Sequence, residues 1–161
     1  MEIIEYYGSD RKEHWLAEIG KSDWRAGQYL YELLRDGKLR EMCGASTRVL
    51  MSTDGDDRVA FCTFADNDDI DAPDLTPWVG FVFTFPEYRG HRYMGLLLEH
   101  AYKLALSEGF KHIYISTGEI GLYEKYGYSF WKTMPDIYGE ESRVYRIEVS
   151  FHSLPGNCSS R

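Results

Sequence analysis

Residues 83–98, with the sequence FTFPEYRGHRYMGLLL, combine the end of a strand, a glycine turn and the start of a helix. Residues 83–85 alternate in character up to Pro86, where we expect the strand to end. The turn at residues 89–95 contains two glycines and three potential cations. Apolar residues then recur at helical spacing, so we expect a helix from about Tyr93. Backbone N–H groups and the positive end of the helix dipole would converge at this turn, which therefore favours a phosphate.

The rest of the chain alternates strand-like and helix-like segments. Apolar and β-branched runs predict strands at residues 2–7, 47–52, 58–65, 77–85, 112–116, 128–132 and 143–151. Amphipathic patterns bounded by caps and glycines predict helices at residues 10–20, 23–37, 93–108 and 118–126. Asp54-Gly55 predicts a hairpin, and the strand at residues 77–85 reads as buried on both faces. This order predicts an α/β (α+β) fold, with a mixed sheet of about seven strands and helices on both faces.

Length and composition indicate one globular domain. A chain of 161 residues is long enough for a single core, which we place at residues 1–152, with a tail at residues 153–161. The start of the chain lacks the basic and apolar regions of a signal peptide. Three widely spaced cysteines, Cys43, Cys62 and Cys158, fit free thiols in a reducing compartment. We therefore expect a cytoplasmic protein.

Several classes of partner are disfavoured by composition. The net charge of −8 argues against nucleic acid and leaves room for a cationic small molecule. No apolar run approaches the roughly 20 residues of a membrane-spanning helix, so no membrane partner is expected. The histidines show no metal-ligand spacing with cysteine or aspartate, so we expect no metal at His14, His91, His100, His112 or His152.

Two common phosphate-binding motifs do not fit the glycine turn. Gly90 and Gly95 have the spacing of the first half of a nucleotide P-loop, but Leu96 and Leu97 stand where that loop needs lysine and serine or threonine. The dinucleotide fingerprint G-x-G-x-x-G is absent.

The turn resembles motif A of the GNAT superfamily of N-acetyltransferases, whose usual form is R/Q-x-x-G-x-G/A after a strand. Residues 86–90, PEYRG, carry this resemblance, and the departures are Arg92 and Met94 at later small positions, with Gly95 one place further on. A second block at residues 121–128, GLYEKYGY, resembles the LYEKxGF signature of the same superfamily. The two blocks occur in the expected order, and together with the strand order between them the resemblance covers about residues 58–131.

The resemblance implies acetyl-CoA as the co-substrate, without a metal. Backbone N–H groups of residues 91–95 would hold the pyrophosphate, and the strand edge at residues 83–85 would pair with the pantetheine arm. A backbone N–H near Phe85 would stabilise the carbonyl oxygen of the thioester during transfer. The residues expected to bind the cofactor are Phe83, Thr84, Phe85, Arg89, Gly90, His91, Arg92, Tyr93, Met94 and Gly95.

The resemblance also assigns Tyr123 as the general acid that protonates the leaving sulfur. The general base stays open. The strand at residues 77–85 contains no acidic residue, and the candidates are Asp71, Asp74, Glu119, a more solvated Glu87, or a chain of waters. The acidic loop at residues 66–74 is either a solvated turn or a device that recruits a cationic amine.

We expect an N-acetyltransferase that moves an acetyl group from acetyl-CoA directly to a primary amine of a small molecule or peptide. The alternative is a non-catalytic sensor or scaffold that binds acyl-CoA, which the missing acid at residues 77–85 favours. The acceptor is not readable from a motif; its selection is expected in residues 24–31, 66–74 and 136–142. The tyrosine-rich final strands provide an edge for a homodimer.

Overall fold

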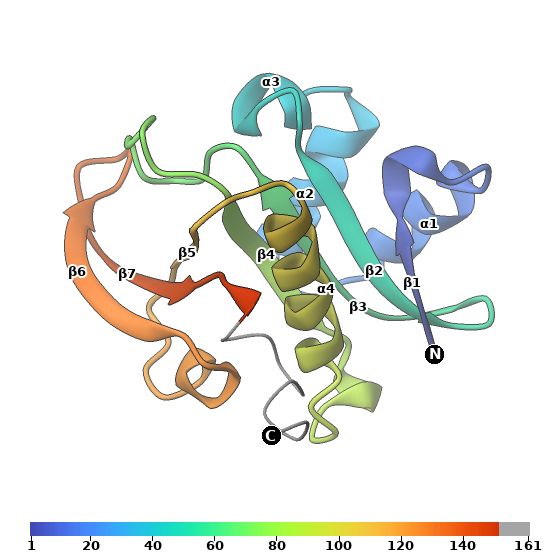
Figure 1. The fold of residues 1–161 in the computed structure, drawn as a ribbon. Helices are drawn as coiled ribbons and strands as arrows, with labels where there is room; N and C mark the ends of the chain where they lie inside the picture. The colour runs from blue at the N-terminus through green and yellow to red at the C-terminus, as the bar shows by residue number, and fades with distance from the viewer. Residues whose placement is uncertain (152–161) are drawn as a thin grey trace, which may run out of the picture.

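The computed structural model describes residues 1–151, which form one seven-stranded sheet with helices on both faces (Figure 1). The strands are β1 (Glu2–Glu5), β2 (Arg48–Asp54), β3 (Asp57–Ala65), β4 (Trp78–Thr84), β5 (His112–Ser116), β6 (Ser129–Pro135) and β7 (Glu141–Glu148). The helices are α1 (Lys12–Ile19), α2 (Arg25–Arg35), α3 (Leu39–Cys43) and α4 (Met94–Ser107), with 3₁₀ turns η1 (Tyr6–Gly8), η2 (Pro86–Tyr88) and η3 (Tyr123–Tyr126). The predicted fold class is confirmed. The predicted tail at residues 153–161 lies outside the described residues.

The strands lie in the order β1-β2-β3-β4-β5-β7-β6, and each neighbouring pair is antiparallel except β4 with β5. Helix α4 connects these two parallel strands, as the sequence predicts. The β2–β3 hairpin closes with Asp54 opposite Asp57, which confirms the turn predicted from Asp54-Gly55.

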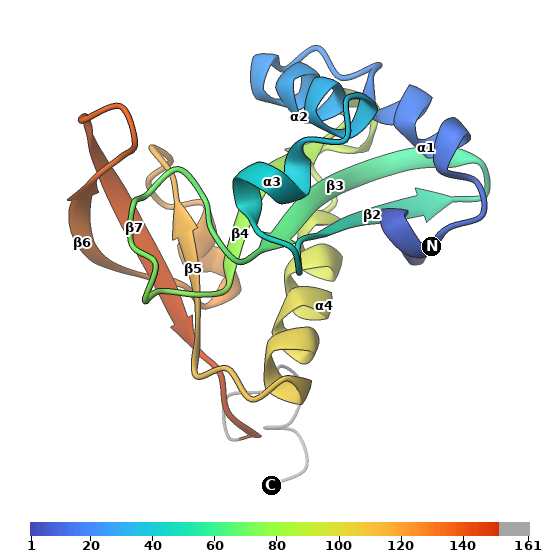
Figure 2. The same cartoon turned by 90° about the horizontal axis from the view of Figure 1, so that it is seen from above.

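The sheet has two halves because β4 and β5 diverge. They share one register pair, Trp78 with Tyr114, and no further pairing among the described residues. Figure 2 shows β5, β7 and β6 leaning away from β4, while β2, β3 and β4 stay together. Beyond Val79, the edge of β4 that faces β5 is therefore left without a strand partner.

Helix α4 covers one face of the sheet, and α1, α2 and α3 cover the other (Figure 2). The alternation of strand side chains explains both contacts. On β3, Cys62 belongs to the same core cluster as Leu97 of α4, while the preceding Phe61 belongs to the core cluster of Leu30 of α2. All four side chains are fully buried. No helix among residues 1–151 is long and apolar enough to span a membrane.

Some local predictions need correction. Strand β1 ends at Glu5, because residues 6–8 turn into η1 instead of extending the strand to residue 7. The helix predicted at residues 118–126 is the single 3₁₀ turn η3, although Gly127 does follow it in the left-handed conformation. Strand β4 is buried at its start, but its centre is only half-buried, because the centre borders the gap between the two halves of the sheet.

Candidate active site

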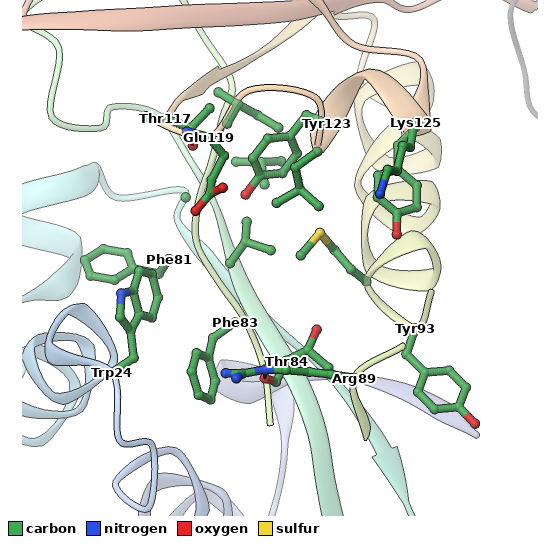
Figure 3. Close-up of a pocket in the computed structure, with 18 of the residues that line it drawn as sticks. Trp24, Phe81, Phe83, Thr84, Arg89, Tyr93, Thr117, Glu119, Tyr123 and Lys125 are labelled. Carbon is green, nitrogen blue, oxygen red and sulfur yellow. Dashed lines mark hydrogen bonds between the residues drawn. The ribbon is translucent and has the colours of Figure 1, made fainter. Parts of the chain in front are cut away.

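A cavity of about 1070 Å³ occupies the gap where β4 leaves β5 (Figure 3). Its wall comes from β4, from the turn before α4, from η3, and from the loop between β5 and η3. Sites for one small ligand occupy about 300–1,000 Å³, so this cavity has room for two reactants side by side.

The turn before α4 presents unpaired donors. The consecutive backbone N–H groups of residues 90–94 have no hydrogen-bond acceptor within residues 1–151, and no side chain caps the helix. Gly90 (φ 87°) and Arg92 (φ 59°) are both in left-handed conformations, which turns successive N–H groups toward one concave face. Such a nest, at the positive end of a helix dipole, binds an anion. These residues therefore fit a pyrophosphate.

The three predicted cations of this turn point in different directions. The guanidinium of Arg92 lies on the cavity wall, with its Cζ 5.9 Å from the ring centre of Tyr126 on η3. Arg89 also lines the cavity, but its side chain lies along β4: its Nε donates to the carbonyl of Thr84 at 2.9 Å, and its Cζ is 5.2 Å from the ring centre of Phe83 (Figure 3). The His91 side chain stacks on Tyr93, 5.2 Å between ring centres. His91 does not line the cavity.

Phe85 and Gly95 do not contribute to the cavity as predicted. Phe85 is 1 % exposed and its N–H donates to the carbonyl of Val59 at 2.9 Å, so neither group is available to a cofactor. Gly95 already donates its N–H to Arg92, and a Cβ there would come within 3.0 Å of the Tyr126 ring. Gly95 therefore lets η3 pack closely against α4 and does not approach the phosphates.

Strand β4 carries a bulge at the cavity. Phe83 pairs with Phe61 and Gly80 pairs with Thr63, so Phe81 and Val82 together face Cys62. Phe81 has φ 49°, and the extra residue bends the strand and leaves backbone groups outside the ladder. Gly80, Phe81 and Val82 all line the cavity. A glycine inside a strand often marks a bulge, so Gly80 could have indicated this bulge from the sequence alone.

Tyr123 lies on the cavity wall, where the sequence predicts the general acid. The side chain is 6 % exposed, and Figure 3 shows its hydroxyl directed into the cavity on the same side as Glu119. Burial, and then the charges of Cys62 and Glu119, raise the pKa of Tyr123 above its ordinary value of 10.0. The phenol therefore keeps its proton at neutral pH and can donate it.

The candidate general bases differ in whether they line the cavity. Glu119 lines the cavity, whereas Asp71 and Asp74 are exposed and lie off its wall. Glu87 is also off the wall, in an ion pair with Arg58 at 3.3 Å. Within residues 1–151, no three His, Cys, Asp or Glu side chains converge to form a metal site.

The far end of the cavity combines aromatic rings with carboxylates. Trp24, at the start of α2, stacks on Phe83 with 5.7 Å between ring centres and 6° between planes. In Figure 3, Trp24 and Phe81 lie on one side of the cavity, and Tyr93 and Lys125 on the other. The acidic residues on the wall are Asp23, Asp69 and Glu119. No sequence motif identified Asp23 or Asp69. Trp24 and Asp69 do, however, belong to residues 24–31 and 66–74, two of the segments that were expected to select the acceptor.

Comparison with known proteins agrees with this geometry. Residues 4–128 match the model of the acetyltransferase (GNAT) family, which is more than half of the chain. The chain belongs to the GNAT acetyltransferase family. The enzyme therefore transfers an acetyl group from acetyl-CoA to an amine. No curated protein matches the chain significantly.

Solved structures of similar fold cover nearly the whole chain. An aminoglycoside 6'-N-acetyltransferase complexed with coenzyme A is 14 % identical over 93 % of this chain and 98 % of its own, with a TM-score of 0.63. The aminoglycoside 6'-N-acetyltransferase from Enterococcus faecium is 13 % identical, with the same coverage and a TM-score of 0.64. A GNAT acetyltransferase from Staphylococcus aureus is 17 % identical over 92 % of this chain and 99 % of its own, with a TM-score of 0.60. At these identities the likeness shows the shared fold.

Proposed function

We propose that this acetyltransferase acts on the primary amine of a small cationic molecule, by direct transfer within the cavity between β4 and β5. The observation that carries the proposal is the opposite character of the two ends of the cavity. Tyr93, at the turn with the unpaired N–H groups, and Lys125 lie on one side in Figure 3, and Trp24 and the carboxylate of Glu119 lie on the other. Arg92 and Asp69 also line the cavity. An anionic cofactor and a cationic acceptor would each find complementary charge. Two of the similar structures are aminoglycoside acetyltransferases, which supports a small-molecule acceptor.

At the cofactor end, the N–H groups of residues 90–94 would bind the pyrophosphate, and Arg92 would add a charged contact. The unpaired edge of β4 would hydrogen-bond to the amides of the pantetheine arm as a neighbouring strand does. Residues 83–84 lie on this edge and on the cavity wall. The thioester would then reach the bulge at Phe81 and Val82.

At the reacting centre, acetyl transfer needs a base, a donor to the carbonyl oxygen and an acid for the leaving sulfur. The amine must be neutral to attack the carbonyl carbon, so a base must take its proton. Backbone N–H groups freed by the bulge at Phe81 would stabilise the negative charge that develops on the carbonyl oxygen. As the C–S bond breaks, Tyr123 would donate its hydroxyl proton to the sulfur. The new C–N bond forms without an acetylated enzyme.

Two measurements test the proposal. Acetyl-CoA should raise the melting temperature of the protein, because it binds only the folded state. Tyr123→Phe should lower kcat by about 10²–10⁴-fold, the range for loss of a general acid, while the melting shift with acetyl-CoA stays nearly unchanged. Unchanged turnover in this variant would remove Tyr123 from the mechanism, and an absent melting shift would remove the cofactor site.

Location and assembly are further proposals. Cys43 and Cys62 are buried free thiols, which supports a reducing cytoplasm. Strand β6 is the outer strand of its half of the sheet and exposes Phe130 (45 %), which supports a homodimer through this edge.

A further inference from the structure

The loop between β3 and β4 brings two neighbouring carboxyl groups to the cavity wall, because Asp69 lines the cavity and Asp68 contacts Gly80, which also lines it. The carboxyl group of Asp68 lies directly over Gly80 of β4, where a Cβ would collide with its Oδ1. Asp69 lines the cavity, and its own Oδ1 is buried without a hydrogen-bond partner within residues 1–151. The backbone of Asp69 is fixed, because its carbonyl accepts the N–H of Ile137 at 2.7 Å. The loop thus holds the Asp68 carboxyl group against Gly80 and the Asp69 side chain on the same cavity wall.

This pair has no counter-charge in the described part of the chain. Among residues 1–151, no Lys, Arg or His forms an ion pair with Asp68 or Asp69. Thr63 is 0 % exposed, and its Oγ1 is 3.2 Å from the same Cβ position at Gly80, also without a partner. Buried polar atoms are normally satisfied, so this cluster is suited to a ligand that brings several N–H donors and a positive charge.

The electrostatics of the pair fit a proton acceptor. Burial, and then the charge of Asp69, raise the pKa of the Asp68 carboxyl group well above its ordinary value. The other groups that interact with Asp68 are Cys43 of α3 and Tyr123 of η3, neither of which supplies a positive charge. Burial disfavours the ionised form of Asp68, and so does the nearby charge of Asp69. Once ionised, Asp68 is therefore a stronger base than an ordinary carboxylate.

We propose that the Asp68–Asp69 pair is the general base that removes a proton from the ammonium group of the acceptor, an inference that rests on the acetyl transfer proposed above. The N–H bond breaks, an O–H bond forms on the pair, and the nitrogen lone pair attacks the thioester carbon. A second proton leaves the nitrogen as the amide forms, and it replaces the proton that Tyr123 gives to the sulfur. The pair then releases its proton to solvent, so the products are the amide, the free thiol and one proton.

The experiment uses the full chain with acetyl-CoA and two acceptors. The first is the best primary alkyl amine from a panel that includes 1,4-diaminobutane, which is an ammonium ion at pH 7. The second is its analogue with two fluorines beside the amine, which lowers the amine pKa so that much more of the nitrogen is already neutral. Thiol release gives kcat/KM for Asp68→Asn, Asp69→Asn and Glu119→Gln. Asp74→Asn is the matched control, because Asp74 belongs to the same loop and is exposed away from the cavity.

We expect Asp68→Asn or Asp69→Asn to lower kcat/KM for the alkyl amine by about 10²-fold or more, with a much smaller loss for the fluorinated amine. The wild-type kcat/KM for the alkyl amine should rise with pH through the raised pKa of Asp68, and this rise should be absent in Asp68→Asn. Equal losses for both amines, unchanged rates, or a selective loss in Glu119→Gln would each overturn the role of the pair. If Asp68→Asn does not fold, the kcat/KM values of Asp69→Asn for the two amines test the role of the pair. A wild-type protein that acetylates neither amine would instead overturn the proposed function.

Discussion

Replacing Arg92 with glycine should make the protein more stable and its cofactor binding weaker. Arg92 has φ 59°, a conformation that costs a residue with a Cβ about 1–2 kcal/mol. Glycine adopts it freely but loses about 0.5–1 kcal/mol more backbone entropy on folding. The net gain is up to about 1.5 kcal/mol, or up to about 3–6 °C in melting temperature for a chain of this size. Calorimetric unfolding of the protein without acetyl-CoA measures this gain.

The same substitution removes a guanidinium from the cavity wall beside the unpaired N–H groups. One charge-assisted hydrogen bond to a phosphate contributes about 1.5–3 kcal/mol, and the exposure of Arg92 places its contribution at the lower end. We therefore expect the Kd for acetyl-CoA to rise about tenfold, with a weaker dependence on salt than in the wild type. Titration calorimetry at two salt concentrations measures both effects.

Arg92→Ala is the matched control, because it removes the charge but keeps a Cβ in the left-handed conformation. It should weaken acetyl-CoA binding as much as the glycine variant and bring no gain in melting temperature. A glycine variant that binds acetyl-CoA as tightly as the wild type would refute the phosphate contact. A glycine variant that melts at a lower temperature than the alanine variant would refute the strain argument.

Trp24→Ala should raise KM for a cationic acceptor about tenfold, because it removes a cation–π contact of roughly 1–2 kcal/mol. The Kd for acetyl-CoA should stay unchanged. An equal loss of affinity for acceptor and acetyl-CoA would contradict the separation of their binding sites at two ends of the cavity. Asp68→Asn should gain thermal stability over the wild type as pH rises. Because the pKa of Asp68 is raised in the folded protein, Asp68 contributes its full stabilisation below the ordinary carboxyl pKa of about 4. This contribution is lost as pH rises through the raised pKa, whereas asparagine at the same position has no such loss. A melting-temperature difference that does not change between pH 4 and pH 9 would show that Asp68 is not perturbed.

Much of the fold could be predicted from local patterns. The hairpin at Asp54-Gly55, the long helix after Arg92, and the glycine after Tyr126 each follow from backbone preferences within a few residues. The motif at residues 86–90 likewise placed a phosphate site at the start of α4, where the backbone N–H groups are unpaired.

The missed features depend on contacts between distant segments. The divergence of β4 from β5 leaves Gly80, Phe81 and Val82 half-exposed, and no alternation in a single strand shows where its neighbour departs. Asp68 reads as one acid in a solvated loop until its position over Gly80 is known. Arg92 looked like an additional cation, and its left-handed backbone explains why glycine is the usual residue there.

The most direct test of the central claim is a screen of primary amines with acetyl-CoA, in which free thiol and acetylated product are both quantified. The proposed function predicts that at least one small cationic amine is acetylated on nitrogen, with one thiol released for each acetyl group transferred. It also predicts that Tyr123→Phe slows this reaction without weakening the binding of acetyl-CoA. Tight binding of acetyl-CoA with no acetylation of any amine across a broad panel would contradict the account and favour a sensor or scaffold that binds acyl-CoA.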